Sequence, residues 1–90
     1  MYAKNLKWNS VAGTHLHKAV QPFENGYSLV LFVTTQYPDV YELSIVFDGE
    51  TVDTEELIGI ECITDEYDEL VIRDLDVDTV EEIAQLVAML

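Results

Sequence analysis

The sequence has few of the residues and segments that make disulfides, membrane spans and leader peptides. Its single cysteine, Cys62, cannot form an internal disulfide, which fits a reducing compartment. No apolar run approaches the roughly 20 residues that cross a bilayer, so no membrane partner is expected. The start, MYAKNLKWNS, has no apolar stretch after its charges, so no signal peptide is predicted. We therefore expect a cytoplasmic protein.

Basic residues and clustered glycines are also scarce. Four Lys and Arg stand against eighteen Asp and Glu, which gives a net charge of −14. Such a chain is repelled by a phosphate backbone, so direct binding of nucleic acid is disfavoured. The four glycines stand alone, and no glycine-rich phosphate-binding loop is present. The sequence predicts no cofactor.

Apolar residues, in contrast, are abundant. They make up 49% of the chain, far more than a disordered acidic tail contains. Ninety residues lie near the low end of independently folding size, where about 60 to 65% of the unfolded surface is buried. We predict one folded domain over residues 1–90.

The charge is unevenly distributed along the chain. Residues 1–38 hold three lysines and Glu24, a net charge of +2, whereas residues 39–90 hold seventeen acids against Arg73, a net charge of −16. Solubility of a small domain needs a net charge of only about 2 to 8. Self-repulsion at the higher density destabilises the compact state, so the excess calls for a functional explanation.

Turn dipeptides and alternating apolar residues predict an antiparallel sheet. Asn25-Gly26 suits a tight hairpin turn between residues 15–23 and a strand at 27–34. Both faces of 27–34 are apolar, which predicts a central strand covered on both sides. Leu6 and Trp8 are expected to supply a further strand or a lid on the core. The other expected elements are strands at 41–47, 51–52, 58–63 and 69–75 and a single helical turn capped by Asp53 or Thr54.

A helix is predicted over residues 79–90. Asp78, with Glu81 three residues later, resembles a capping box, and apolar residues follow at helical spacing. The expected fold is therefore α+β: a meander-like antiparallel sheet of four to six strands with this C-terminal helix packed on one face. Leu86, Met89 and Leu90 widen the apolar stripe, so a homodimer through the helix is an alternative.

Three residue patterns could carry metal or nucleophile chemistry, and we adopt none of them. Asp74, Asp76 and Asp78 have the first three spacings of a calcium loop, but the required glycine and the final glutamate are missing. His15 and His17 would share one face of a strand without two further zinc ligands. Cys62 sits among apolar residues and suits the core better than a catalytic pair. We predict no metal site, no catalytic residue and no enzymatic activity.

The acidic surface is the remaining candidate site. Its bland interpretation is a solvated face that resists aggregation. Its functional interpretation is a rigid row of carboxylates that enters a strongly basic protein groove. Tyr67, within the acidic turn, is an aromatic anchor candidate. The predicted partner-binding residues lie in that turn and at the start of the helix: Asp65, Glu66, Tyr67, Asp68, Glu69, Asp74, Asp76 and Asp78.

Two resemblances point to a viral source. The segments FENGYS and YELSIVFDGE, followed by the acidic helix start, resemble small bacteriophage-encoded accessory proteins with an F-x-N-G-Y strand and a Y-E-L-x-V strand. The likeness covers about residues 22–90, and Ser28 stands where those proteins commonly have glycine. The acidic composition also resembles that of phage inhibitors of host defence, including DNA-mimicking anti-restriction and anti-CRISPR proteins. The matching residues are Phe23, Asn25, Gly26, Tyr27, Tyr41, Glu42, Leu43, Val46, Val80 and Ile83.

The functional hypothesis from the sequence is a small non-catalytic phage inhibitor that acts in the host cytoplasm. Its acidic face would block the basic, nucleic-acid-binding groove of a host defence nuclease or CRISPR complex. The alternative is an oligomeric structural or interaction module of a phage, in which the acidity serves solubility only.

Overall fold

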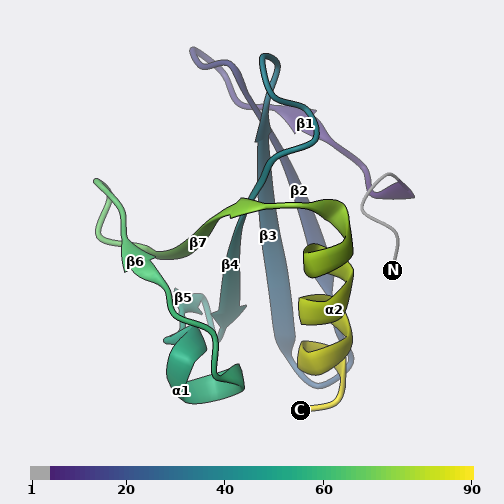
Figure 1. Cartoon of the computed structure of the whole chain (residues 1–90), viewed down its shortest axis with the longest axis vertical. Helices are drawn as coiled ribbons and strands as arrows, with labels where there is room; N and C mark the ends of the chain where they lie inside the picture. Colours follow the sequence, from purple (N-terminus) through teal and green to yellow (C-terminus); the bar gives the residue numbers. More distant parts are fainter. Residues whose placement is uncertain (1–4) are drawn as a thin grey trace.

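The computed structural model describes residues 5–90, so Lys4 of the basic N-terminal segment lies outside the described residues. Residues 5–90 form seven strands and two helices (Figure 1). Their bounds are β1 Asn9–Ser10, β2 Leu16–Pro22, β3 Tyr27–Thr34, β4 Tyr41–Phe47, β5 Glu50–Thr51, α1 Thr54–Ile58, β6 Ile63–Thr64, β7 Leu70–Leu75 and α2 Val77–Ala88.

The strands form an antiparallel sheet in the order β1-β2-β3-β4-β7-β6, and β5 pairs with β4 outside this path. The first four strands follow one another as a meander, and β7 then returns to the free side of β4. Helix α2 lies against one face of the sheet, whereas the hairpin of β6 and β7 projects on the opposite side (Figure 1). The predicted α+β fold with a C-terminal helix on an antiparallel sheet is confirmed.

The hairpin of β2 and β3 forms around the predicted turn. Gly26 has a φ of +90°, which a residue without a Cβ adopts at little cost. The Asn25 side chain accepts a hydrogen bond from the backbone N–H of Tyr27 at 3.1 Å. Its amide donates to the backbone carbonyl of Val87 at 2.8 Å, on the last turn of α2. The turn therefore also fixes the C-terminal end of the helix.

The core lies between α2 and alternate residues of β3 and β4. Leu29 and Leu31 of β3 and Leu43 and Ile45 of β4 are completely buried. They pack with a helical stripe of the predicted spacing, because residues three and four apart share one face of a helix. The stripe consists of Val80, Ile83, Ala84 and Val87.

Helix α2 begins two residues earlier than predicted. Asp76, not Asp78, is the N-cap: its backbone is extended, and its carboxylate accepts a hydrogen bond from the N–H of Thr79 at 2.8 Å. Hydrogen bonding by the Thr79 side chain, followed by the bond from its backbone N–H, lowers the pKa of Asp76. Asp78 instead lies in the first turn, where a negative charge is favoured by the helix dipole. Because Asp76 and Asp78 can each cap a helix, the sequence alone does not decide where α2 begins. The prediction that Asp78 is the N-cap was wrong.

The segment between α1 and β7 differs from the prediction. Asp53 caps α1, as one of the two expected caps, by accepting a hydrogen bond from the N–H of Glu55 at 3.0 Å. Residues 58–63 were expected to form a strand, but only Ile63 of that range pairs with β7. The alternating apolar residues Ile58, Ile60 and Cys62 pack against the core without a sheet partner. The alternating pattern indicates that these residues are buried, and residues of a loop can be buried as well as residues of a strand.

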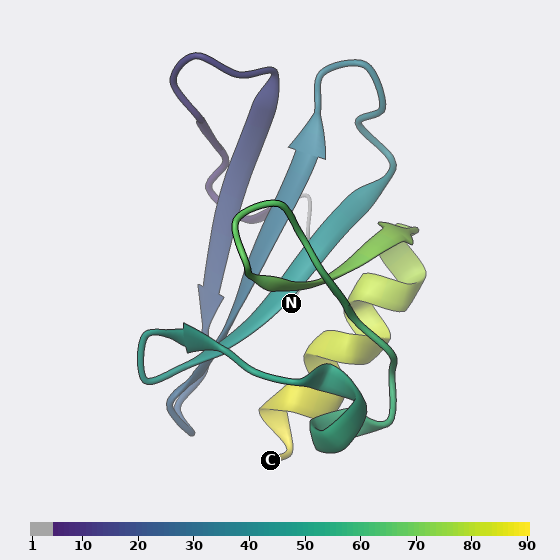
Figure 2. The same cartoon turned by 90° about the vertical axis from the view of Figure 1, so that its left-hand side faces the viewer.

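The second face of the sheet has no helix on it. Strand β3 is central, as predicted, with β2 on one side and β4 on the other. Val30 and Phe32, on the face away from α2, are nonetheless only partly buried. The expectation that β3 is covered on both sides was therefore wrong. Among the described elements, the turn between β6 and β7 lies over this face (Figure 2).

Candidate functional site

The acidic residues gather on one side of the molecule, which we call the acidic side. Residues 48–69 contain ten acids and no Lys, Arg or His, and they form β5, α1, β6 and the connections around them. These elements lie together on the side away from α2 (Figure 1). Nine of the ten acids are exposed. The acidic side consists of Asp48, Glu50, Asp53, Glu55, Glu56, Glu61, Asp65, Glu66, Asp68 and Glu69.

Hydrogen bonds between side chains and backbone hold the acidic side together. The Thr51 hydroxyl of β5 donates to the Glu69 carboxylate at 2.9 Å and accepts from the N–H of Leu70 at 3.2 Å. The Thr54 hydroxyl of α1 donates to the carbonyl of Ile60 at 2.5 Å. Hydrogen bonds therefore link segments that are nearly twenty residues apart in the sequence. Because these segments are already ordered, little conformational entropy is lost when a partner binds.

The turn between β6 and β7 is ordered by its own first residue. The Asp65 carboxylate accepts hydrogen bonds from the backbone N–H groups of Tyr67 and Glu69, each at 2.9 Å. Asp68 takes up a left-handed backbone with a φ of +63°, which aspartate tolerates better than most residues. Asp65 thus stabilises the turn. Glu66, Tyr67 and Asp68 extend from the turn into solvent, and Tyr67 is 78% exposed.

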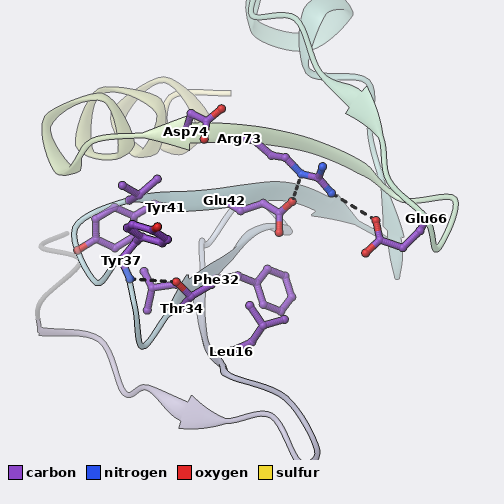
Figure 3. Close-up of a pocket in the computed structure, with 11 residues that line it drawn as sticks. Leu16, Phe32, Thr34, Tyr37, Tyr41, Glu42, Glu66, Arg73 and Asp74 are labelled. Carbon is purple, nitrogen blue, oxygen red and sulfur yellow. Dashed lines mark hydrogen bonds and ion pairs between the residues drawn. The ribbon is translucent and has the colours of Figure 1, made fainter.

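Arg73 is the basic residue within the candidate site. Its Nε donates to the Glu42 carboxylate at 2.6 Å, and a second nitrogen lies 3.5 Å from the Glu66 carboxylate (Figure 3). The hydrogen bond to Glu42 is the main cause that raises the pKa of Arg73. The guanidinium joins β7, β4 and the acidic turn but neutralises only one of the two carboxylates. The group keeps a net negative charge.

A bulge in β7 changes the direction of the residues that follow. Tyr41 pairs with Leu75 and Leu43 with Ile72, so β7 has one more residue than β4 between these pairs. Asp74, with a φ of +59°, lies in the bulge. Arg73 and Asp74 consequently both border the face away from α2, although neighbouring strand residues normally point in opposite directions.

The structure divides the eight predicted partner-binding residues into two groups. Those of the turn, Asp65 to Glu69, lie at one end of β7, and Asp76 and Asp78 lie beyond its other end. Six strand residues separate them by roughly 17 to 20 Å. Asp74 borders the same hollow as Glu66 of the turn group. The two groups therefore form two patches and not one continuous row.

Two hollows lie side by side on the face of the sheet away from α2, which we call the open face. The first has a volume of about 490 Å³ and is bordered by Leu16, Phe32, Glu42, Glu66, Arg73 and Asp74, among others (Figure 3). The second, of about 320 Å³, lies under the acidic turn and is bordered by Val30, Phe32, Val46, Asp65, Tyr67 and Glu69, among others. Phe32 borders both hollows, so they adjoin one another, and we call the two hollows together the trough.

The sequence reasoning missed this trough. The apolar second face of residues 27–34 is the sequence feature that corresponds to the trough, but the prediction assigns a covering layer to this face. Tyr41 was also not singled out: it is 5% exposed, and burial followed by the charges of Asp39 and Glu81 raises the pKa of its hydroxyl. Its ring reaches the first hollow from the core side of β4.

Residues 5–90 contain no group of three or more His, Cys, Asp or Glu side chains that could hold a metal ion. Neither helix in this part of the chain has the length and apolar character needed to cross a membrane.

No protein-family model matches the chain, and no curated protein or solved structure is significantly similar to it.

Proposed function

We propose that the protein is a bacteriophage-encoded inhibitor without catalysis of its own, which acts in the host cytoplasm. It places its acidic side in the basic, nucleic-acid-binding groove of a host defence nuclease or CRISPR complex. The observation that carries the proposal is the concentration of ten acids from residues 48–69, a segment without a basic residue, on one braced side of a folded domain. The phage source rests on the resemblances in the sequence.

The spacing of the acidic side suits mimicry of nucleic acid. Side chains on one face of a strand recur about every 6.6 to 6.8 Å, and neighbouring strands lie about 4.8 Å apart. Each strand of B-DNA carries a charge about every 3.4 Å along the helix axis. Acids from two or three adjacent elements therefore reach a comparable charge density. The turn residues Glu66, Tyr67, Asp68 and Glu69 are the proposed centre. Asp74 borders the same hollow as Glu66, and Asp76 and Asp78 form the second patch beyond the other end of β7.

Electrostatic attraction would make the association of the two proteins fast and its affinity dependent on salt concentration. Complementary charge steers diffusing partners toward each other, and exposed charges are screened as ionic strength rises. Tyr67 would add an apolar contact in the middle of the charged turn, of the kind that dominates the energetics of many interfaces.

The experiment compares two triple charge reversals in inhibition of purified restriction endonucleases and CRISPR effector complexes. The acidic-side variant carries Glu50→Lys, Glu56→Lys and Glu61→Lys. The control variant carries Glu24→Lys, Asp39→Lys and Glu82→Lys, all exposed and outside the acidic side. Each reversal adds two charges, so both variants have a net charge of −8 in place of −14.

We expect inhibition to be lost in the acidic-side variant and retained in the control. Equal loss in both variants would mean that only total charge matters. Equal retention in both would remove Glu50, Glu56 and Glu61 from the mechanism.

A second candidate function is self-association as a structural module. Leu86, Met89 and Leu90 at the end of α2 are exposed by 44, 83 and 47% and continue the apolar stripe beyond the sheet. A sizing column distinguishes the two functions. A stable dimer that separates on Met89→Lys would favour the module, whereas a monomer at all concentrations would favour the inhibitor.

A further inference from the structure

We infer that the trough on the open face binds a short basic segment of the partner protein that carries large apolar side chains. This inference rests on the proposed function, because it takes the partner to be a basic protein, and it specifies how that partner is held. Charge attraction would bring the segment to the acidic side. Apolar contact in the trough would then keep it there.

The floor of the trough is apolar and accessible. Val30 and Phe32 of β3 and Val46 of β4 line it while only partly buried. Three of the nine large apolar side chains that are exposed in residues 5–90 border the two hollows. They are Tyr37, Val40 and Tyr67. Grouped exposure of this kind marks an interaction surface, whereas single exposed residues do not.

The margin of the trough determines which occupant fits. Three acidic residues and one basic residue, Arg73, border the first hollow. Asp65, Glu69 and Lys18 border the second. Both hollows therefore combine an apolar floor with a net negative margin. A segment that matches them has apolar side chains flanked by Lys or Arg.

The same charges disfavour other occupants of the trough. A second copy would bring its own net charge of −14 against this margin. Nucleic acid would meet the same repulsion from its phosphates.

The ion pairs of Arg73 leave a position at the margin of the trough where a basic side chain of the partner can bind. The contact of Arg73 with Glu66 is long, at 3.5 Å, and the Glu66 side chain is 70% exposed. Its contact with Glu42 is short, at 2.6 Å, and that carboxylate is more buried. A partner's Lys or Arg can therefore replace Arg73 at Glu66 while the link to Glu42 remains. Exposed pairs of this type contribute little to stability, so the exchange costs little.

The test uses two labelled peptides with the same charge and length. One is Gly-Lys-Lys-Phe-Lys-Leu-Lys-Lys-Gly, and the other has Ser in place of Phe and Leu. Binding to the full chain is measured by fluorescence anisotropy, and the site is mapped from amide chemical shifts of the isotope-labelled protein. We expect the apolar peptide to bind at least about tenfold more tightly, with shift changes centred on Lys18, Phe32, Val46 and Val71.

A variant confirms the site independently. Phe32→Ser leaves the charge unchanged and should reduce the difference between the two peptides to less than about threefold. Val20→Ser, on the same face of β2 but outside both hollows, is the matched control and should keep the difference. The shift map needs no variant, so the test stands even if Phe32→Ser fails to fold.

The following results would overturn the inference: equal affinity of the two peptides, shift changes confined to the acidic side, or shift changes that grow with protein concentration alone because a second copy covers the trough. The inference and the proposed function fail separately. Peptide binding without inhibition of any defence protein would contradict only the function. Inhibition that survives Phe32→Ser would contradict only the inference.

Discussion

The two faces of this sheet are made by the same strands and differ sharply in what covers them. On the α2 face, Leu29, Leu31, Leu43 and Ile45 are completely buried. On the open face, Val30, Phe32 and Val46 of the same strands are only partly buried and are bordered by carboxylates. The first face supplies the stability of the domain, whereas the second remains accessible. Side-chain alternation thus gives one small sheet a buried face and an accessible face.

The largest expected effect comes from adjacent residues of β3. Leu31→Ala should lower the free energy of unfolding by about 2 to 5 kcal/mol, because it leaves a cavity against α2. Val30→Ala, one residue earlier and on the open face, should cost less than about 1 kcal/mol. Urea denaturation of both variants measures the difference. Similar losses would mean that the open face is as well packed as the core.

A smaller effect is expected at the turn that joins the two ends of the domain. Asn25→Ala should cost about 1 to 2 kcal/mol, because the bonds to the carbonyl of Val87 and the N–H of Tyr27 are lost. Asn9→Ala, at an exposed position on β1, should change the stability by less than about 0.5 kcal/mol. Thermal unfolding provides the comparison. Equal melting temperatures for the two variants would remove the role assigned to Asn25.

Salt should stabilise the domain through the acidic side. The Debye length falls from about 30 Å at 10 mM salt to about 8 Å at 150 mM, which screens repulsion among the exposed carboxylates. The melting temperature should therefore rise with sodium chloride. The rise should be smaller in the variant with Glu50→Lys, Glu56→Lys and Glu61→Lys than in the control reversed at Glu24, Asp39 and Glu82. An identical salt response would show that the charge is evenly spread.

The smallest effect concerns pH and the N-cap of α2. Hydrogen bonds from the side chain and then the backbone N–H of Thr79 depress the pKa of Asp76 in the folded state. Their contribution is therefore present above the unfolded pKa and is lost as pH falls through the folded pKa. Asp76→Asn should be less stable than the unchanged protein near pH 7, and the gap should close at strongly acidic pH. Asp78→Asn should show a flatter difference. A constant gap for Asp76→Asn would contradict the assignment of the cap.

The sequence predicted the elements whose local signals agree with their tertiary surroundings. Asn25-Gly26 specifies a hairpin turn by backbone geometry alone, and the stripe from Val80 to Val87 specifies a buried helix face. The start of α2 was misplaced because two aspartates can each cap a helix. The choice between them depends on packing, which the local pattern does not contain.

The candidate site was only partly predictable for a similar reason. The concentration of acids in residues 48–69 is visible in the sequence, but their common side follows from the way β5, α1 and β6 are placed. The bulge that turns Arg73 and Asp74 toward one face has no local signal. The sequence also does not show that the apolar face containing Phe32 lacks a covering layer. An alternating apolar pattern shows which residues share a face of the strand, but it does not show what packs against that face.

The most direct test of the central claim is displacement of labelled duplex DNA from an inhibited defence nuclease at stepwise salt concentrations. The account predicts that the protein and DNA compete for one site and that the affinity of the protein falls steeply as salt rises. The steepness should decrease with reversal of Glu50, Glu56 and Glu61 and persist with reversal of Glu24, Asp39 and Glu82. Simultaneous binding of DNA and protein, or an affinity that does not change with salt, would contradict it.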